Sequence, residues 1–101
     1  MFCMNEVYEL DIFSETLQTL EPVERAWIEK IKDQLKDDLF VGKPLRYEWL
    51  REKRYNNKRI YYLINPMTRK ALIVAFGSKK EQQQIIDSVI GGKEYLLALI
   101  R

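Results

Sequence analysis

The stretch that decides the fold is Leu50–Ile64, LREKRYNNKRIYYLI, in which two strand-like runs flank a pair of asparagines. Tyr47–Arg54 and Arg59–Ile64 contain the aromatic and β-branched residues that favour strands. Asn56 and Asn57 predict a tight reversal between the two runs, because asparagine tolerates the positive φ that short hairpin turns require. The stretch therefore predicts an antiparallel hairpin.

The residues before the hairpin predict one strand and two helices. Glu6–Phe13 is expected to be a strand, and Ser14 is expected to cap a short helix that follows it. From Leu20 onward, apolar residues recur at the spacing of one helical face over about 18 residues. Pro22 suits the first turn of this amphipathic helix, because its missing N–H costs nothing there.

The residues after the hairpin predict a third strand and a last helix. Ala71–Phe76, ALIVAF, is apolar on both faces and fits a central strand. Ser78 and Glu81 have the spacing of a capping box, which predicts a helix from Lys79. The apolar tail KEYLLALIR fits either a helical turn or a strand. The prediction is one α+β domain over residues 1–101, with two N-terminal helices and a C-terminal helix packed on one face of a small, mainly antiparallel sheet.

The composition is that of a single folded domain. Of the 101 residues, 47% are hydrophobic and 32% charged, so the chain is too apolar to be disordered. No apolar run approaches the roughly 20 residues that cross a bilayer, and the N-terminus lacks a signal-peptide pattern, so a cytoplasmic location is expected. Cys3 is the single cysteine and histidine is absent, which excludes disulfides within the chain and Cys/His zinc sites. No metal or other cofactor is expected.

Charge is distributed unevenly along the chain. Residues 1–42 hold four cations and ten acids, residues 43–80 hold eleven cations and two acids, and residues 81–101 hold two cations and three acids. The net charges of these segments are −6, +9 and −1. Such asymmetry predicts that the middle segment faces a polyanion.

Strand alternation decides which cations of the hairpin stand on an open face of the sheet. The even-numbered residues of the second strand are all apolar, so Arg59 and Tyr61 are expected to point outward together. Burial of Leu50 would likewise place Arg51 and Lys53 on the open face. The alternative is that these cations only protect a sheet edge from pairing with another chain. Because crowded like charges on adjacent strands cost stability, the cluster favours a phosphate-bearing ligand.

Two further features accompany the basic hairpin. Lys79 and Lys80 lie in the expected first turn of the last helix, where the dipole disfavours cations but free backbone N–H groups favour a phosphate. Two solvated lysines are the alternative. Rings interleave with the cations, a mixture that binds single-stranded nucleic acid, although each ring taken alone fits a core position. These rings are Tyr47, Trp49, Tyr55 and Tyr61.

The chain resembles a known family through four segments in a fixed order. They are GKPL at Gly42–Leu45, EKR at Glu52–Arg54, NKRIYYLI at Asn57–Ile64 and FGSKKEQQQIID at Phe76–Asp87. These segments resemble the RelE/ParE superfamily of toxins from type II toxin–antitoxin systems. The resemblance implies a small α+β fold and a ribosome-dependent endoribonuclease that cuts messenger RNA without a metal, by attack of the RNA 2′-hydroxyl on the adjacent phosphate. The expected partners are a cognate antitoxin protein, the ribosome and messenger RNA.

The resemblance also implies roles for individual residues. Arg59 and Arg54 are expected to hold the scissile phosphate. Lys53 is expected to be the base for the 2′-hydroxyl and Lys80 the donor to the leaving group. Tyr61 is expected to stack on a base or to donate a proton. The further RNA- and phosphate-binding residues are Lys43, Arg46, Arg51, Lys58 and Lys79.

Two departures from the family pattern leave other functions open. Gln82–Ile86 stands where RelE-type ribonucleases often have an arginine followed by an aromatic residue, and Glu52 stands where a lysine can be catalytic. One alternative is a ParE-like inhibitor of DNA gyrase, for which Arg59 would matter little. Another is a nucleic-acid-binding module of the same fold that has lost the chemistry.

Overall fold

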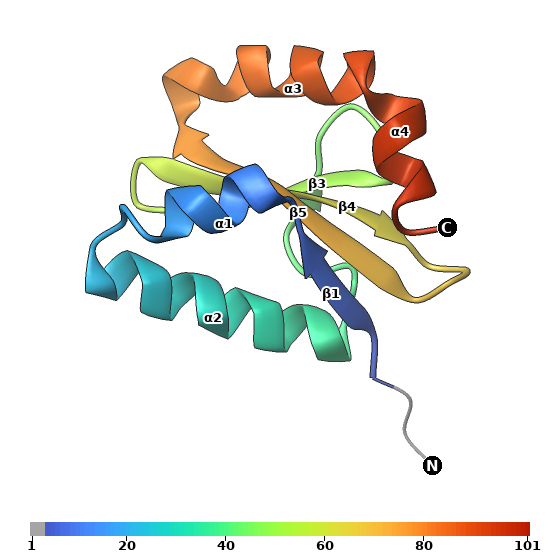
Figure 1. The fold of residues 1–101 in the computed structure, drawn as a ribbon, viewed down its shortest axis with the longest axis horizontal. Helices are drawn as coiled ribbons and strands as arrows, with labels where there is room; N and C mark the ends of the chain where they lie inside the picture. The colour runs from blue at the N-terminus through green and yellow to red at the C-terminus, as the bar shows by residue number, and fades with distance from the viewer. Residues whose placement is uncertain (1–3) are drawn as a thin grey trace.

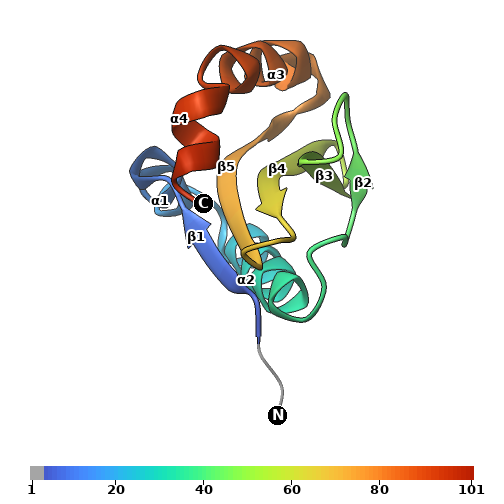
Figure 2. The same ribbon diagram turned by 90° about the vertical axis from the view of Figure 1, so that its right-hand side faces the viewer.

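A five-stranded sheet runs through the middle of the molecule in the computed structural model, which describes residues 4–101 (Figures 1 and 2). β1 pairs parallel with β5, and the other pairs in the strand order β1-β5-β4-β3-β2 are antiparallel. This mixed architecture confirms the expected α+β class. The elements in chain order are β1 (Glu6–Glu9), α1 (Asp11–Leu17), α2 (Pro22–Asp37), β2 (Lys43–Pro44), β3 (Leu50–Tyr55), β4 (Lys58–Asn65), β5 (Lys70–Ser78), a 3₁₀ turn (Lys79–Glu81), α3 (Gln82–Gly91) and α4 (Lys93–Ala98).

The β3–β4 hairpin forms where the asparagine pair predicts it. Tyr55 pairs with Lys58 beside the turn, and the register continues to Leu50 opposite Leu63. Asn56 has a left-handed φ of 52°, which the tight reversal needs. This register fixes which side chains of the hairpin share a face.

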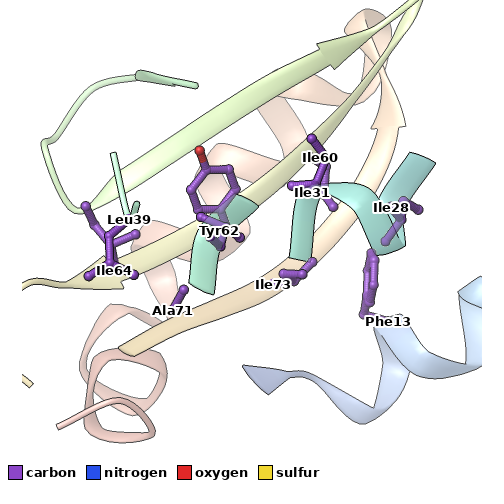
Figure 3. Close-up of a cluster of buried hydrophobic side chains, with 10 residues drawn as sticks. Phe13, Ile28, Ile31, Leu39, Ile60, Tyr62, Ile64, Ala71 and Ile73 are labelled. Atoms are coloured by element: carbon purple, nitrogen blue, oxygen red, sulfur yellow. The ribbon is translucent and has the colours of Figure 1, made fainter. Parts of the chain in front are cut away.

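The helices α1 and α2 cover one face of the sheet and form a first core with it (Figure 3). α2 begins at Pro22 and presents an apolar stripe to the sheet, as the helical spacing predicts. The even-numbered residues of β4 face this stripe, so that side of the hairpin is a core face as expected. The buried members are Phe13, Ile28, Ile31, Leu35, Leu39, Ile60, Tyr62, Ile64, Ala71 and Ile73.

The opposite face of the sheet is covered as well, by α3 and α4 (Figure 1). The prediction that helices lie on one face only is therefore wrong. The reason is that Tyr61 and Leu63 are apolar on this face of β4, and β5 is apolar on both faces, so both faces need cover. The apolar tail supplies part of this cover as the helix α4. The buried members of this second core are Leu50, Tyr61, Leu63, Leu72, Val74, Ile86, Val89, Leu96 and Ile100.

The first strand and the first helix meet earlier in the chain than predicted. β1 ends at Glu9, and Ser14 lies within α1 instead of capping it. The Ser14 hydroxyl donates to the Glu9 carboxylate, and Lys32 of α2 forms an ion pair with the same group. Although partial burial opposes ionisation, these two contacts lower the pKa of Glu9. They tie both N-terminal helices to the end of β1.

The start and the end of the C-terminal layer are held by side chains. The Ser78 N–H donates to Glu81 Oε1 at 3.0 Å, which confirms the predicted capping box, although a 3₁₀ turn precedes α3. The carbonyl of Ile100 accepts from Asn65 and Thr68. None of the helices in residues 4–101 has the length and apolarity that a membrane span requires. Cys3 lies outside the described residues.

Candidate nucleic-acid site

Four cations surround one pocket beside the start of α3. Lys43 comes from β2, Arg46 from the loop that follows it, Arg59 from β4 and Lys79 from the 3₁₀ turn. Figure 2 shows the loop after β2 rising beside the start of α3, which brings these distant segments together. The pocket, which we call the cation pocket, has a volume of about 450 Å³ and is completed by Pro44, Leu45, Glu52, Gln82 and Ile86.

Glu52 is the single carboxylate among the residues that line the cation pocket. Its side chain is 4% exposed. Arg59 Nε lies 3.3 Å from its Oε2, and Lys43 Nζ lies 3.7 Å from its Oε1. The Gln82 amide donates to Oε2 at 2.8 Å. The buried carboxylate therefore has two cations and one hydrogen-bond donor to offset its loss of water, and it joins β2, β4 and α3 at one point.

The hairpin register accounts for this arrangement. Glu52 lies opposite Tyr61 on β4 and opposite Lys43 on β2, and Arg54 lies opposite Arg59. Because residues opposite each other, and residues two apart on a strand, share a face, the two arginines stand together next to Glu52. The carboxylate reduces the like-charge repulsion that the pair would otherwise suffer.

Arg59 faces the cation pocket, but it is not open to solvent as predicted. Its side chain is 11% exposed, and Glu52 engages its Nε. The prediction of an outward, unobstructed arginine is wrong because Lys79 of the 3₁₀ turn and Gln82 at the start of α3 line the same pocket beside it.

Tyr61 shares the face of Arg59, as predicted, but it is fully buried. Ile86 and Val89 of α3 belong to the same apolar cluster. Burial, reinforced by the charge of Glu52, raises the pKa of Tyr61 to about 12. The prediction that Tyr61 points outward to stack on a base is therefore wrong.

Arg51 also lies away from solvent, on the other side of β3, and is 5% exposed. Its Nη2 donates to the carbonyls of Phe40 and Gly42 at 3.1 and 3.2 Å, and its guanidinium lies 5.2 Å from the centre of the Phe40 ring. The prediction that Arg51 is exposed on the open face is wrong, because the chain between α2 and β2 folds over it. Its contacts hold the segment that leads into Lys43.

Lys53 and Arg54 line a neighbouring hollow of about 380 Å³. This hollow shares Lys43 and Glu52 with the cation pocket, so the two adjoin each other. Arg54 Nε donates to the carbonyl of Asn56 at 2.9 Å, which fixes the base of its guanidinium against the hairpin turn. Both residues thus lie beside the cation pocket. Lys53 pairs with Ile60, so it stands on the face of the hairpin opposite to Arg59, and the prediction that the two cations share a face is wrong.

Lys58 and Lys80 lie apart from both hollows. Lys58 Nζ pairs with Glu24 of α2 at 2.7 Å and lies 5.4 Å from the centre of the Phe76 ring. The hydrogen bond from Lys58 lowers the pKa of Glu24, although its small burial works the other way. Lys80 is exposed on the 3₁₀ turn, and Lys79 is the lysine of this turn that reaches the cation pocket.

The aromatic residues near the hairpin divide into two groups. Tyr55 packs against Trp27 of α2, with ring centres 4.9 Å apart. Tyr47 and Trp49 stack on each other with ring centres 5.0 Å apart and an interplanar angle of 11°. The second pair lies on the loop that supplies Arg46.

Glu52 and Gln82 are members of the site that the sequence alone did not predict, because both look like departures from the family pattern. A signal for Glu52 was present. With Asn56 and Asn57 as a two-residue turn, the register places Glu52 on the face of Arg59, two pairs farther from the turn. The contact of Gln82 had no such signal, because it depends on how α3 docks on the sheet.

The fold is that of RelE-type toxins, as solved structures show. The toxin–antitoxin complex RelBE2 from Mycobacterium tuberculosis contains a chain with a TM-score of 0.63 and 24% identity, and the match covers 75% of this chain and 99% of that one. A mutant of the E. coli toxin RelE in the free state has a TM-score of 0.68 and 10% identity, over 79% of this chain and 88% of that one. No protein-family model and no curated protein sequence matches the chain. The RelE-like fold predicted by the sequence resemblance is confirmed.

Proposed function

We propose that the protein is the toxin of a type II toxin–antitoxin pair and that it cuts messenger RNA on the ribosome. The observation that carries the proposal is the convergence of Lys43, Arg46, Arg59 and Lys79 on one pocket. A phosphodiester is a ligand that such a cluster of cations favours, because several charge-assisted contacts can reach one phosphate. The RelE-like fold supports the same class of function.

The balance of charge in the cation pocket favours a phosphate. Four cations and one carboxylate line it, so a net positive charge faces an incoming anion. Glu52 engages Arg59 at Nε, which leaves the guanidinium aimed along a fixed direction. Because the Arg59 donor is already oriented, binding of a phosphate costs little free energy for ordering this side chain.

In the proposed mechanism the carboxylate of Glu52 is the base for the 2′-hydroxyl. It lines the cation pocket together with Arg59, whereas Lys53 lines only the adjoining hollow. In the proposed step the 2′-oxygen attacks phosphorus, its proton passes to Glu52, and the bond from phosphorus to the 5′-oxygen breaks to leave a 2′,3′-cyclic phosphate. Arg59 stabilises the charge that grows on the phosphate oxygens.

Lys79 replaces Lys80 as the proposed proton donor to the leaving 5′-oxygen. Its ammonium is the one from the 3₁₀ turn that lines the cation pocket. Gln82 would hold Glu52 in place through its hydrogen bond of 2.8 Å and so take a positioning role instead of the arginine and aromatic residues of the family pattern.

The proposed partner is an antitoxin protein, which would neutralise the toxin with an amphipathic helix and acidic side chains. A mostly apolar hollow of about 430 Å³ lies between β5 and the last two helices, and Leu10, Ile85 and Tyr95 are among the residues that line it. The similar RelBE2 chain belongs to a toxin–antitoxin complex, which supports a partner of this class.

The test is growth arrest on induced expression. The double variant Lys43→Ala/Lys79→Ala should lose toxicity, because it removes two pocket cations that are exposed at the surface. The matched control Lys30→Ala/Lys93→Ala removes the same charge from exposed sites on α2 and α4 and should remain toxic.

Mapping of the 5′ ends of cellular messages then identifies the target. Cuts within translated codons support the ribonuclease. Arrest with intact messages and a DNA-damage response would favour a gyrase inhibitor, and harmless expression of the unaltered protein would favour a module without chemistry. Equal toxicity of the pocket variant and its control would defeat the proposed site.

A further inference from the structure

The stacked pair Tyr47–Trp49 is an aromatic feature that the proposed chemistry does not use. The two rings lie 5.0 Å apart at 11°, so one face of Tyr47 is covered by Trp49. Tyr47 is 39% exposed, and Trp49 packs against the second core. A large aromatic ring that is stacked on one side and exposed to solvent offers its second face to a planar partner.

Backbone hydrogen bonds fix the turn that carries this pair. The Leu50 N–H donates to the Tyr47 carbonyl at 3.2 Å and closes a tight turn around the two aromatic residues. The turn is tied to the sheet, because the Ile64 N–H donates to the Trp49 carbonyl at 2.9 Å and the Leu45 N–H donates to the Leu50 carbonyl at 2.9 Å. A ring held in this way loses little conformational entropy when a ligand stacks on it.

The pair also lies next to the cation pocket along the chain. Arg46 lines the pocket, and Tyr47 is the next residue, with its Cα about 3.8 Å farther on. Glu48, which separates Tyr47 from Trp49 in the sequence, has its carboxylate 3.4 Å from the Arg51 guanidinium, which offsets part of its charge. An aromatic platform next to phosphate-binding cations is the combination that single-stranded nucleic acid requires.

We propose that Tyr47, backed by Trp49, is a stacking platform for the RNA base adjacent to the phosphate in the cation pocket. This inference rests on the proposed function and adds a binding subsite to it. The stack would run from Trp49 through Tyr47 to the base, while Arg46 contacts the phosphate of the same nucleotide. Stacking on a π-face is tolerant of sequence, so the platform strengthens binding without reading one particular base.

The test is binding of a fluorescein-labelled RNA tetranucleotide with 2′-O-methyl riboses, which block cleavage, measured by fluorescence anisotropy. A second probe has the same backbone and phosphate count but lacks its bases. Tyr47→Ala should weaken binding of the RNA by about 5- to 50-fold and leave binding of the abasic probe unchanged. Tyr47→Phe, which keeps the ring, should bind like the unaltered protein. Tyr8→Ala, which removes a tyrosine that is 44% exposed on β1, is the matched control.

The outcomes separate this inference from the proposed function. Equal binding of the RNA by the unaltered protein and by Tyr47→Ala would overturn the platform and leave phosphate binding intact. An equal loss of affinity for both probes in Tyr47→Ala would also overturn the platform, since the ring would then act on the cation pocket instead of on a base. Absence of binding of either probe to the unaltered protein at low salt would overturn the proposed RNA site and the platform with it. Urea unfolding of each variant excludes a loss caused by misfolding.

Discussion

Arg59→Ala tests whether the ion pair inside the cation pocket stabilises the fold as well as serving the site. The pair joins Nε to a carboxylate oxygen at 3.3 Å, with side chains 11% and 4% exposed. Removal of one partner from a buried pair costs about 3–5 kcal/mol, because the other charge is left uncompensated. Here Glu52 keeps Lys43 at 3.7 Å and the Gln82 amide at 2.8 Å. We therefore expect a smaller loss, about 2 kcal/mol in the free energy of unfolding.

The assay is a double-mutant cycle by urea denaturation. Glu52→Gln removes the charge while it keeps the shape, and the double variant Arg59→Ala/Glu52→Gln leaves no orphaned carboxylate. The double variant should therefore be more stable than the sum of the single effects predicts, by about 1–2 kcal/mol. Because the pair is buried, this coupling should persist at high salt. A coupling energy below about 0.5 kcal/mol would refute the reasoning, since that is the value expected for independent sites.

Three further predictions concern the fold and the site. Gly42→Ala should lower the free energy of unfolding by at least about 2 kcal/mol in thermal unfolding, because Gly42 has a φ of 79° and an added Cβ would lie 2.6 Å from the Tyr62 hydroxyl. Gly91→Ala is the control and should be nearly neutral, because its added Cβ meets nothing within 4 Å. Equal losses of stability in the two variants would contradict the clash. Burial raises the pKa of Tyr62 to about 12, so the free energy of unfolding should fall between about pH 10 and pH 12 as the unfolded chain loses this proton first, by up to about 1.4 kcal/mol per pH unit. In urea titrations at each pH, the free energy of unfolding of Tyr62→Phe should fall less steeply over this pH range. A slope equal to that of the unaltered protein would count against the raised pKa of Tyr62. RNA binding should weaken steeply with salt, and Lys43→Ala should reduce the slope of log affinity against log salt by about one; a flat profile would exclude phosphate contacts.

Local sequence signals were sufficient for much of the fold. The asparagine turn sets the hairpin register, Pro22 marks the start of α2, and the Ser78–Glu81 capping box marks the start of the last helical layer. Each signal acts over a few residues, so it can be interpreted without knowledge of the rest of the chain. The fold class followed from the order of these elements.

Long-range packing accounts for what the sequence did not predict. Tyr61 and Arg59 share a face, as alternation requires, but only the docking of α3 decides that the first is buried and the second largely covered. Arg51 lies inward for a similar reason, because the segment with Phe40 and Gly42 folds over it. Strand alternation predicts that a charged residue next to a buried leucine is exposed, and only the position of the covering segment shows that it is not.

The parallel pairing of β1 with β5 bears on how the protein folds during its synthesis. Glu6 is aligned with Lys70, so the first strand has no partner until roughly 60 further residues have been made. At the usual elongation rate of about 5–20 residues per second, this delay lasts several seconds. The apolar side chains of Phe13 and Ile28, which the sheet covers in the folded protein, stay uncovered for that time, and such exposed apolar surface favours aggregation of the unfinished chain.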